Sequence, residues 1–401
     1  AEGITVDGYA ALQSLSLPAL TTAGEVRVSS SYSVEPTVLY TLSAPLVTSA
    51  AVVVEACDYL TTVTFEKLGT AAHLSLIDNP QLVTASFPLL TQTGDLTVTG
   101  NFWLDEDDVA FGLTDLTFST LVTATGTVTV SENDALATVS MQNLSTLYGL
   151  HVEANPALTK LLLPLVTTLT QGTAADPGAI EIWDNTALCH NPSSCVVALP
   201  LSNLADNVFS WRNNAVTTLA LDSLTAVGQL VIISDAALTS LSFDALVDAP
   251  YVYVQGVTGI SELSLPVLNP AQCDLVLTDN ASLISVNLPV LDNGDGTVRV
   301  ERNDVLTTLS MPAIHLSDLT VRDNAALVNL SGLTGLTHPA EVVVSENPIL
   351  NDISTLATIQ EIDGDLTITD NASLPTASAE AIRDAIGVND IGGEVTISGN
   401  L

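Results

Sequence analysis

Two glutamates of this sequence have the type and spacing that glycoside hydrolysis uses. Glu153 and Glu181 lie in short alternating apolar segments, so a β-sheet would place them on adjacent strands with His151 and Trp183 nearby. Carboxylates about 5 to 9 Å apart can cleave a glycosidic bond. Neighbouring strands bring such pairs together by chance, so we expect no enzyme and assign no catalytic residue. A polysaccharide-active β-helix enzyme is the second alternative function.

Two acidic segments carry the hard oxygen ligands that calcium prefers. One holds Asp105, Asp107 and Asp108, and the other holds Asp292 and Asp295. Neither has the final glutamate of the twelve-residue calcium loop, so solvated turns are the simpler interpretation. The five histidines show no metal-ligand spacing. We therefore expect no cofactor, with calcium as the weak exception.

A group of aromatic and apolar side chains falls at outward positions of the predicted strands in the middle of the chain. Exposed patches of this kind mark surfaces that bind sugar, peptide or another copy of the protein. The alternative is that a longer neighbouring loop covers them. The candidate ligand-binding residues are Glu181, Trp183, Phe209, Trp211, Val231, Ile233 and Tyr253.

Longer connections flank this patch. One contains residues 170–178, and the other contains Cys189 and Cys195, which a short loop can close as a disulfide. Such a ring would fix a loop beside the patch, or simply stabilise it, and implies an oxidising compartment. Cys57 and Cys273 fall in repeats too far apart to pair with each other.

A repeat positions all of these residues. Each unit contains an apolar-polar-apolar strand, an asparagine, a leucine and a second short strand that ends in proline, and the alternation gives each strand one buried side. A lone unit cannot cover its apolar side, so the units must stack in parallel. We predict an all-β, right-handed parallel β-solenoid of about 17 coils, forming one continuous domain over residues 1–401. The predicted strands begin at Ile4, Val26, Val52, Leu74, Leu96, Val128, Leu150, Ile180, Val208, Leu230, Val252, Leu275, Val298, Leu319, Val342, Leu366 and Val395.

An asparagine recurs three residues after the middle of most strands. Its amide can bond both the turn backbone and the copies above and below, which predicts an internal asparagine ladder. Cys57, Asp235 and Val257 stand at the same position and would interrupt it. Glycines such as Gly94 and Gly364 precede strands, where we expect a positive φ. The ladder residues are Asn79, Asn101, Asn133, Asn155, Asn185, Asn213, Asn280, Asn303, Asn324, Asn347, Asn371 and Asn400.

The repeat resembles the receptor L domain. The pattern Asn-x-x-Leu-x-x-Leu-x-Leu-Pro-x-Leu is carried best by residues 280–291, 303–314 and 155–166. Residues 371–400 are similar to the closing segment of bacterial members, with one short helix before the last strand. The chain has no cysteine-rich module, so receptor signalling does not carry over. The resemblance implies an extracellular binding or structural module.

Composition narrows the function further. The 401 residues include 45 Asp plus Glu but only eight Lys plus Arg, a formal charge of −37, which repels nucleic acid. No run of about 18 apolar residues could span a bilayer. The opening residues Ala1-Glu2-Gly3 fit an exported product whose signal peptide has been removed.

We therefore predict a secreted or cell-surface, non-enzymatic binding or adhesion protein that uses an exposed strand face. Its partner would be a protein or glycan at a cell surface. The first alternative is a self-assembling structural subunit of an extracellular sheath or filament, whose partners would be other copies of the chain.

Overall fold

The computed structural model describes residues 2–8, 12–30, 38–170, 177–188, 196–292, 294–312 and 314–401. The ring expected between Cys189 and Cys195 lies outside these residues. The described residues form a parallel β-solenoid of about 15 turns with one α-helix. Its contacts divide it into two compact units, residues 1–195 with 199–201, and residues 196–198 with 202–401. The interpretation as a single continuous domain stays a prediction.

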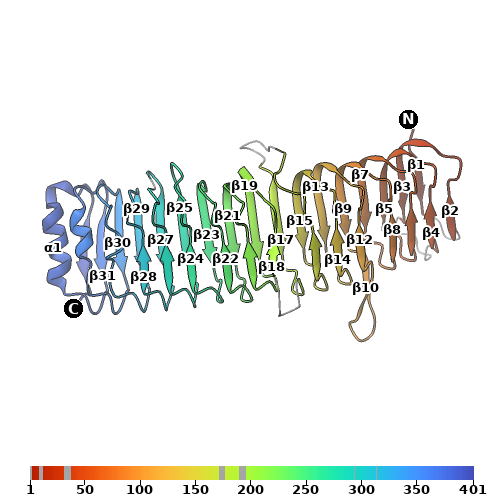
Figure 1. Cartoon of the computed structure of the whole chain (residues 1–401). Coiled ribbons are helices and arrows are strands. Elements are labelled where there is room, and N and C mark those ends of the chain that lie inside the picture. Colours follow the sequence, from red (N-terminus) through yellow and green to blue (C-terminus); the bar gives the residue numbers. More distant parts are fainter. Residues whose placement is uncertain are drawn as a thin grey trace. The chain divides into compact units, whose positions relative to one another are not determined.

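The longer strands of each unit pair in parallel and form its main face (Figure 1). The alternating apolar residues explain them, because every second side chain enters the core. In unit 1 these strands are β1 (Ile4–Asp7), β3 (Thr22–Ser29), β5 (Ser49–Glu55), β7 (Thr70–Ile77), β9 (Gln92–Thr99), β13 (Thr123–Ser131), β15 (Thr146–Glu153) and β17 (Ala179–Trp183). In unit 2 they are β19 (Asn203–Arg212), β21 (Ala226–Ile233), β23 (Tyr251–Gln255), β25 (Asp274–Thr278), β27 (Thr297–Glu301), β29 (Asp318–Arg322), β30 (Glu341–Ser345), β31 (Leu366–Thr369) and β32 (Val395–Ser398).

Shorter parallel strands close the other side of most turns up to β28. Their central residue is apolar and points inward, as Leu42 and Val286 do, and a turn that often contains proline follows. In unit 1 they are β2 (Ser14–Ser16), β4 (Thr41–Ser43), β6 (Thr62–Thr64), β8 (Thr84–Ser86), β12 (Asp115–Thr117), β14 (Thr138–Ser140) and β16 (Lys160–Leu162). In unit 2 they are β18 (Val196–Ala198), β20 (Thr218–Ala220), β22 (Ser240–Ser242), β24 (Glu262–Ser264), β26 (Ser285–Asn287) and β28 (Thr308–Ser310).

The register of the main strands confirms the predicted alternation with one exception. Leu96 pairs with Val128, and Leu319 pairs with Val342, so first inward residues stack on first inward residues. In β19 the inward residues are Phe209 and Trp211, both fully buried, instead of Val208. The prediction that Phe209 and Trp211 face outward is therefore wrong.

The error in β19 is a shift of one residue, which moves every side chain of a strand to the other face. Residues on both sides of this strand are apolar, so either side could be predicted to face the core. Only one of the two choices buries the two large aromatic rings. The same shift corrects the ladder, because Asn213 is exposed and Asn214 is the buried amide.

The asparagine ladder is present in both units. Asn303 shows its geometry: Nδ2 donates to the carbonyl oxygens of Leu277 and Glu301 at 3.0 Å, while Oδ1 accepts from the backbone N and Nδ2 of Asn280 at 3.2 and 3.1 Å. Each amide thus satisfies backbone groups that the corner removes from the sheet. The same contacts link Asn79, Asn101, Asn133, Asn155 and Asn185 in unit 1, and Asn280, Asn303, Asn324, Asn347, Asn371 and Asn400 in unit 2.

A left-handed residue precedes each ladder position and turns the amide inward. Asp78, Asp370 and Gly256 have φ values of 51°, 57° and 64°. The sequence placed the positive φ before the strand, at Gly94 and Gly364, and this is wrong. Those glycines serve close packing instead, because a Cβ at Gly94 would lie 2.0 Å from the carbonyl oxygen of Ala72.

The predicted interruptions of the ladder are confirmed. The backbone N of Cys57 and of Val257 donates to the next asparagine, although neither side chain continues the row. Asp235 is the buried carboxylate of the described residues, and its oxygens accept hydrogen bonds from Trp211 Nε1 at 2.8 Å and from the backbone N of Asn214 at 3.1 Å. Burial, the largest effect, raises the pKa of Asp235 above its usual 3.8, although these hydrogen bonds oppose it.

Replacing Asp235 with asparagine should lower stability at pH 7 by about 1–2 kcal/mol, because Oδ1 and Oδ2 each accept two N–H groups and an amide nitrogen in place of either oxygen would face two donors. The folded-state pKa of Asp235 is raised, so protonation of this carboxyl stabilises the folded protein. That stabilisation is fully present below the unfolded pKa and is lost as pH rises through the folded pKa. Protonation in acid favours folded wild type and has no counterpart in the variant, so the deficit of Asp235→Asn should grow as pH falls toward 4. Thermal unfolding of both proteins at pH 7 and near pH 4 measures this, and a pH-independent difference would contradict the burial of a charged Asp235.

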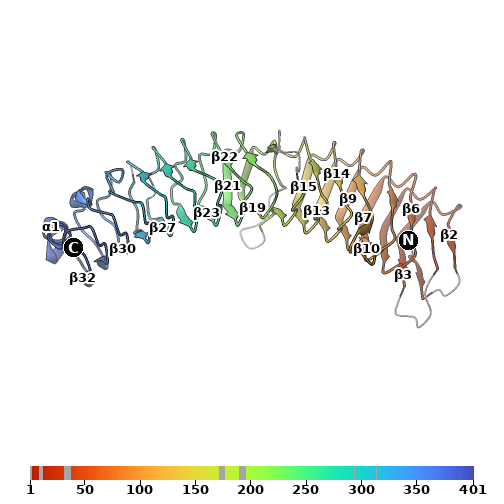
Figure 2. The ribbon, with the colours of Figure 1, turned by 90° about the horizontal axis from the view of Figure 1, so that it is seen from below.

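A short helix closes unit 2, as the sequence predicted. Helix α1 (Thr376–Ile386) follows the 3-10 turn η1 (Ser354–Thr358) and precedes η2 (Val388–Asp390). Ala379, Ile382 and Ile386 are buried on one side of α1, and the helix packs against η1 and β32 (Figure 2). It thereby covers apolar residues that the last turn would otherwise expose.

Candidate functional site

In unit 1 the predicted site residues Glu181 and Trp183 point outward from β17 and are half-buried. His151 pairs with Glu181 across β15 and β17, with 3.1 Å between Nε2 and Oε2. Burial is the largest effect on Glu181 and raises its pKa, which His151 lowers and Glu153 raises further. A carboxyl group of raised pKa can act as a general acid, so the glycosidase hypothesis retains a chemical basis but stays a prediction.

In unit 2 the predicted residues Val231, Ile233 and Tyr253 point outward from β21 and β23. Phe209 and Trp211 do not contribute to this face, because they fill the core beneath it. The expected aromatic patch therefore loses its two largest members. Its remaining aromatic residue in unit 2, Tyr253, instead lines a groove together with residues of β25 and β27.

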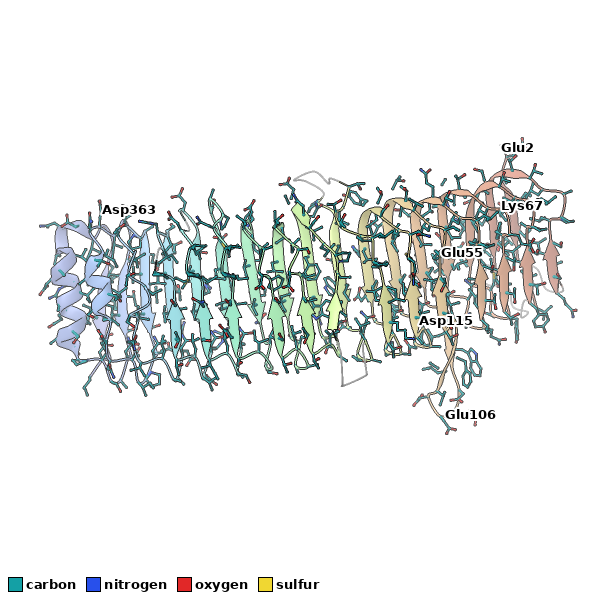
Figure 3. All side chains as sticks on the ribbon, viewed as in Figure 1. Glu2, Glu55, Lys67, Glu106, Asp115 and Asp363 are labelled. Carbon is teal, nitrogen blue, oxygen red and sulfur yellow. The ribbon has the colours of Figure 1, made fainter. Side chains whose placement is uncertain are left out.

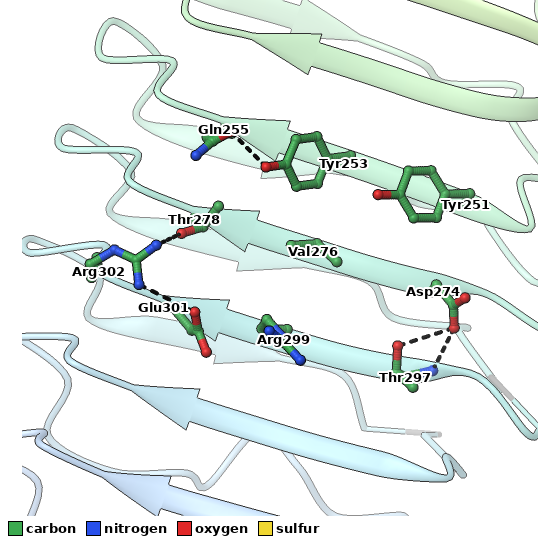
Figure 4. A pocket seen from close by; sticks show the side chains of 10 residues that line it. All are labelled: Tyr251, Tyr253, Gln255, Asp274, Val276, Thr278, Thr297, Arg299, Glu301 and Arg302. Carbon is green, nitrogen blue, oxygen red and sulfur yellow. Dashed lines mark hydrogen bonds and ion pairs between the residues drawn. The ribbon is translucent and has the colours of Figure 1, made fainter.

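An open groove of about 390 Å³ lies on the outer face of β23, β25 and β27 (Figure 4). Tyr251 and Tyr253 stand side by side on β23, with 6.2 Å between ring centroids and 18° between ring planes. Val276 pairs with Tyr253 on the next strand, and Arg299 pairs with Val276 on the strand after that. Two tyrosine rings, the Val276 side chain and the Arg299 guanidinium therefore line the groove from three consecutive strands.

A hydrogen-bonded chain fixes one end of the groove. The hydroxyl of Tyr253 donates to Gln255 Oε1 at 2.6 Å, and Gln255 Nε2 donates to Asp279 Oδ2 at 3.2 Å. Arg302 donates from Nε to Asp279 Oδ1 at 2.6 Å and from Nη2 to Thr278 Oγ1 at 2.7 Å. The Arg302 hydrogen bond, the largest effect, lowers the pKa of Asp279 to about 2, so this end keeps its ion pair in weak acid.

Arg299 and Asp274 leave polar groups available inside the groove. Arg299 is exposed and forms no hydrogen bond or ion pair with the residues that the structure describes. Asp274 Oδ1 accepts from the backbone N and Oγ1 of Thr297 at 3.1 and 3.0 Å, which fixes the carboxylate. Its Oδ2 has no such partner among the described residues. The groove therefore offers a donor with several N–H groups and an acceptor.

The Tyr251 hydroxyl remains protonated across neutral pH. Burial is the largest effect on Tyr251 and raises its pKa, and Tyr253 and Asp274 raise it further. A neutral phenol can donate one hydrogen bond and accept others. The aromatic wall therefore carries polar edges beside apolar ring faces.

The described residues of the two acidic segments belong to no group of metal ligands. Within the described ranges, no group of three or more His, Cys, Asp or Glu side chains is placed to hold a metal ion. Asp105 Oδ1 accepts from the backbone N of Asp107 and Val109, which makes it a turn residue. Asp292 pairs with His315 at 2.8 Å. Asp108 and Asp295 are exposed, and calcium binding stays a prediction.

Sequence reasoning missed Tyr251, Asp274 and Arg299 as site residues. Tyr251 lies two residues before Tyr253 and so shares its face. Arg299 stands at the outward position that Tyr253 and Val276 occupy on the preceding strands. Aligning the strands by their first inward residue and comparing the outward columns across three consecutive turns would have found this cluster.

None of the described helices has the length and apolar composition that crossing a membrane requires. The chain matches no protein-family model, no curated protein and no solved structure.

Proposed function

We propose that this chain is a non-enzymatic binding protein of the cell surface or extracellular space, which holds a hydroxyl-rich glycan in the groove over β23, β25 and β27. The observation that carries the proposal is the pair of tyrosine rings beside an unpaired guanidinium, Arg299, in one open groove. The resemblance of the repeat to receptor L domains supports the same class of function.

The ring faces supply the apolar part of the recognition. A pyranose presents C–H groups on its faces and hydroxyl groups around its edge, so an aromatic ring packs against the face while polar groups meet the edge. Tyr251 and Tyr253 offer two neighbouring rings, and Val276 extends the apolar surface. The wall is therefore wide enough for more than one contact with a sugar chain.

The polar residues match hydroxyl groups, which both donate and accept. Arg299 donates, and the free oxygen of Asp274 accepts, on two strands of the same groove. Glu301 adds a second carboxylate to the lining. With a net charge of −37 on the chain, these carboxylates favour a neutral glycan over a polyanionic one. An open groove of this kind implies a dissociation constant of about micromolar to millimolar.

Tyr253→Ala and Arg299→Ala should each weaken binding of a glycan selected on a glycan array by about tenfold or more. Tyr253→Ala removes a ring face, and Arg299→Ala removes the donors. Tyr40→Ala is the matched control, because Tyr40 is an exposed tyrosine of unit 1 that packs against Tyr59. Calorimetric titration measures the affinities, and equal affinity in all four proteins would refute the groove as the site.

Self-assembly into a sheath or filament is the alternative. It was expected to use an outward aromatic patch, but Phe209 and Trp211 are buried and cannot serve it. Val231 and Ile233 remain as half-buried aliphatic residues on that face. The geometry of unit 2 therefore favours ligand binding over self-association.

A further inference from the structure

The segment between two ladder positions of unit 1 contains an insertion. Asn101 and Asn133 are 32 residues apart but bond to each other as directly as Asn79 and Asn101, which are 22 apart. Leu96 still pairs with Val128, so the solenoid continues without the extra residues. They form an antiparallel hairpin of β10 (Phe102–Leu104) and β11 (Ala110–Gly112).

This hairpin projects from the side of unit 1 (Figure 3) and exposes large apolar side chains. Trp103 and Phe111 pair across it, with 4.8 Å between ring centroids and 20° between planes. They are 40% and 43% exposed, and Leu104 and Val109 are 47% and 50% exposed. Large exposed apolar side chains on a projection, with two aromatic rings stacked on one face, are typical of a surface that another protein covers.

The turn of the hairpin is held by side-chain hydrogen bonds and is acidic. Asp105 Oδ1 accepts from the backbone N of Asp107 and Val109 at 3.0 and 2.9 Å, and the left-handed Asp108 has a φ of 60°. Residues 105–108 are all acidic, and residues 102–112 contain no lysine or arginine. Charge therefore limits the partner, because an acidic surface, including a second copy of this chain, would be repelled.

We propose that this hairpin is a docking element for a basic protein, whose apolar pocket bordered by lysine or arginine takes Trp103 and Phe111. The aromatic pair supplies the buried contact, and the acidic turn supplies attraction and orientation. The proposal uses none of the residues of the glycan groove and does not depend on that site. A neutral or anionic lipid surface is a poorer match, since four carboxylates lie at the tip.

A synthetic peptide of alternating valine and lysine serves as the probe, with valine-glutamate and serine-lysine peptides for comparison. Wild type should bind only the valine-lysine peptide tightly, as measured by fluorescence anisotropy of labelled peptide. The double substitution Trp103→Ser with Phe111→Ser should weaken it by about tenfold or more. Glu106→Gln with Asp107→Asn and Asp108→Asn, which keeps the Asp105 turn, should weaken it by about threefold or more at low salt.

The matched control is Val83→Ser with Leu89→Ser, which removes exposed apolar residues of the same unit outside the hairpin. It should bind the peptide as wild type does. Equal binding of the serine-lysine peptide by wild type, or unchanged valine-lysine binding after either hairpin substitution, would show attraction by the overall charge alone and overturn the proposal. Circular dichroism establishes that each variant is folded.

Discussion

Replacing Trp211 with alanine is expected to lower the free energy of unfolding by about 3–5 kcal/mol. The indole is fully buried under β19, and its Nε1 is one of the donors that compensate the buried carboxylate of Asp235. The substitution therefore leaves a cavity and weakens the hydrogen bonding of a buried acid. Chemical denaturation followed by circular dichroism measures the change.

Trp183→Ala is the matched control, because Trp183 points outward from β17 and is only half-buried. It should cost about 1 kcal/mol or less. Equal losses for the two tryptophans would contradict the assignment of one to the core and the other to the surface.

Asn303→Ala is expected to lower the free energy of unfolding by about 3 kcal/mol or more. The side chain satisfies the carbonyl oxygens of Leu277 and Glu301 and the backbone N of Asn280, all beside the apolar core. Alanine removes these hydrogen bonds and leaves the backbone N and Nδ2 of Asn280 without this acceptor, although the carbonyl oxygen of Glu301 still accepts from the backbone N of Asp279 at 3.2 Å. Equilibrium unfolding in urea measures the loss.

Two other asparagines provide the comparison. Asn400→Ala should cost less, because Asn400 is half-buried at the end of the row and donates to Ile368 alone. Asn351→Ala should be close to neutral, because that side chain is exposed. Three equal values would show that the ladder contributes nothing beyond ordinary polar surface.

Much of the fold could be predicted because one short pattern repeats. The alternation of Leu96-Thr97-Val98 or Leu366-Thr367-Ile368 fixes which side of a strand is buried, and stacking then follows from the need to cover it. The asparagines were predictable for the same reason, since their spacing from the strands is constant. Seventeen main strands were predicted, and seventeen are described.

The phase of β19 could not be read from alternation, because Val208 and Phe209 are both apolar. A second rule distinguishes the two choices: a residue with a positive φ comes directly before each buried ladder amide. Asn213 has the positive φ and Asn214 is the amide. With that rule, the paired asparagines would have indicated that Phe209 and Trp211 are inside.

The two candidate sites were harder to predict than the fold. Arg299 joins Tyr251 and Tyr253 only through strand pairing, because its sequence distance from them carries no periodic signal of its own. Trp103 and Phe111 flank the acidic residues 105–108, which suggested calcium binding. The stacking of the two rings depends on a hairpin that is not part of the repeat. Both proposed sites thus lie at positions where the repeat varies or is interrupted.

A crystal structure of the chain with an oligosaccharide that it binds would test the proposed function most directly. The account predicts a sugar ring packed on Tyr251 or Tyr253, with hydroxyl groups bonded to Arg299 and Asp274 and the glycosidic bonds intact. A bound sugar located instead beside His151, Glu181 and Trp183, or a cleaved glycan there, would contradict it and favour a hydrolase.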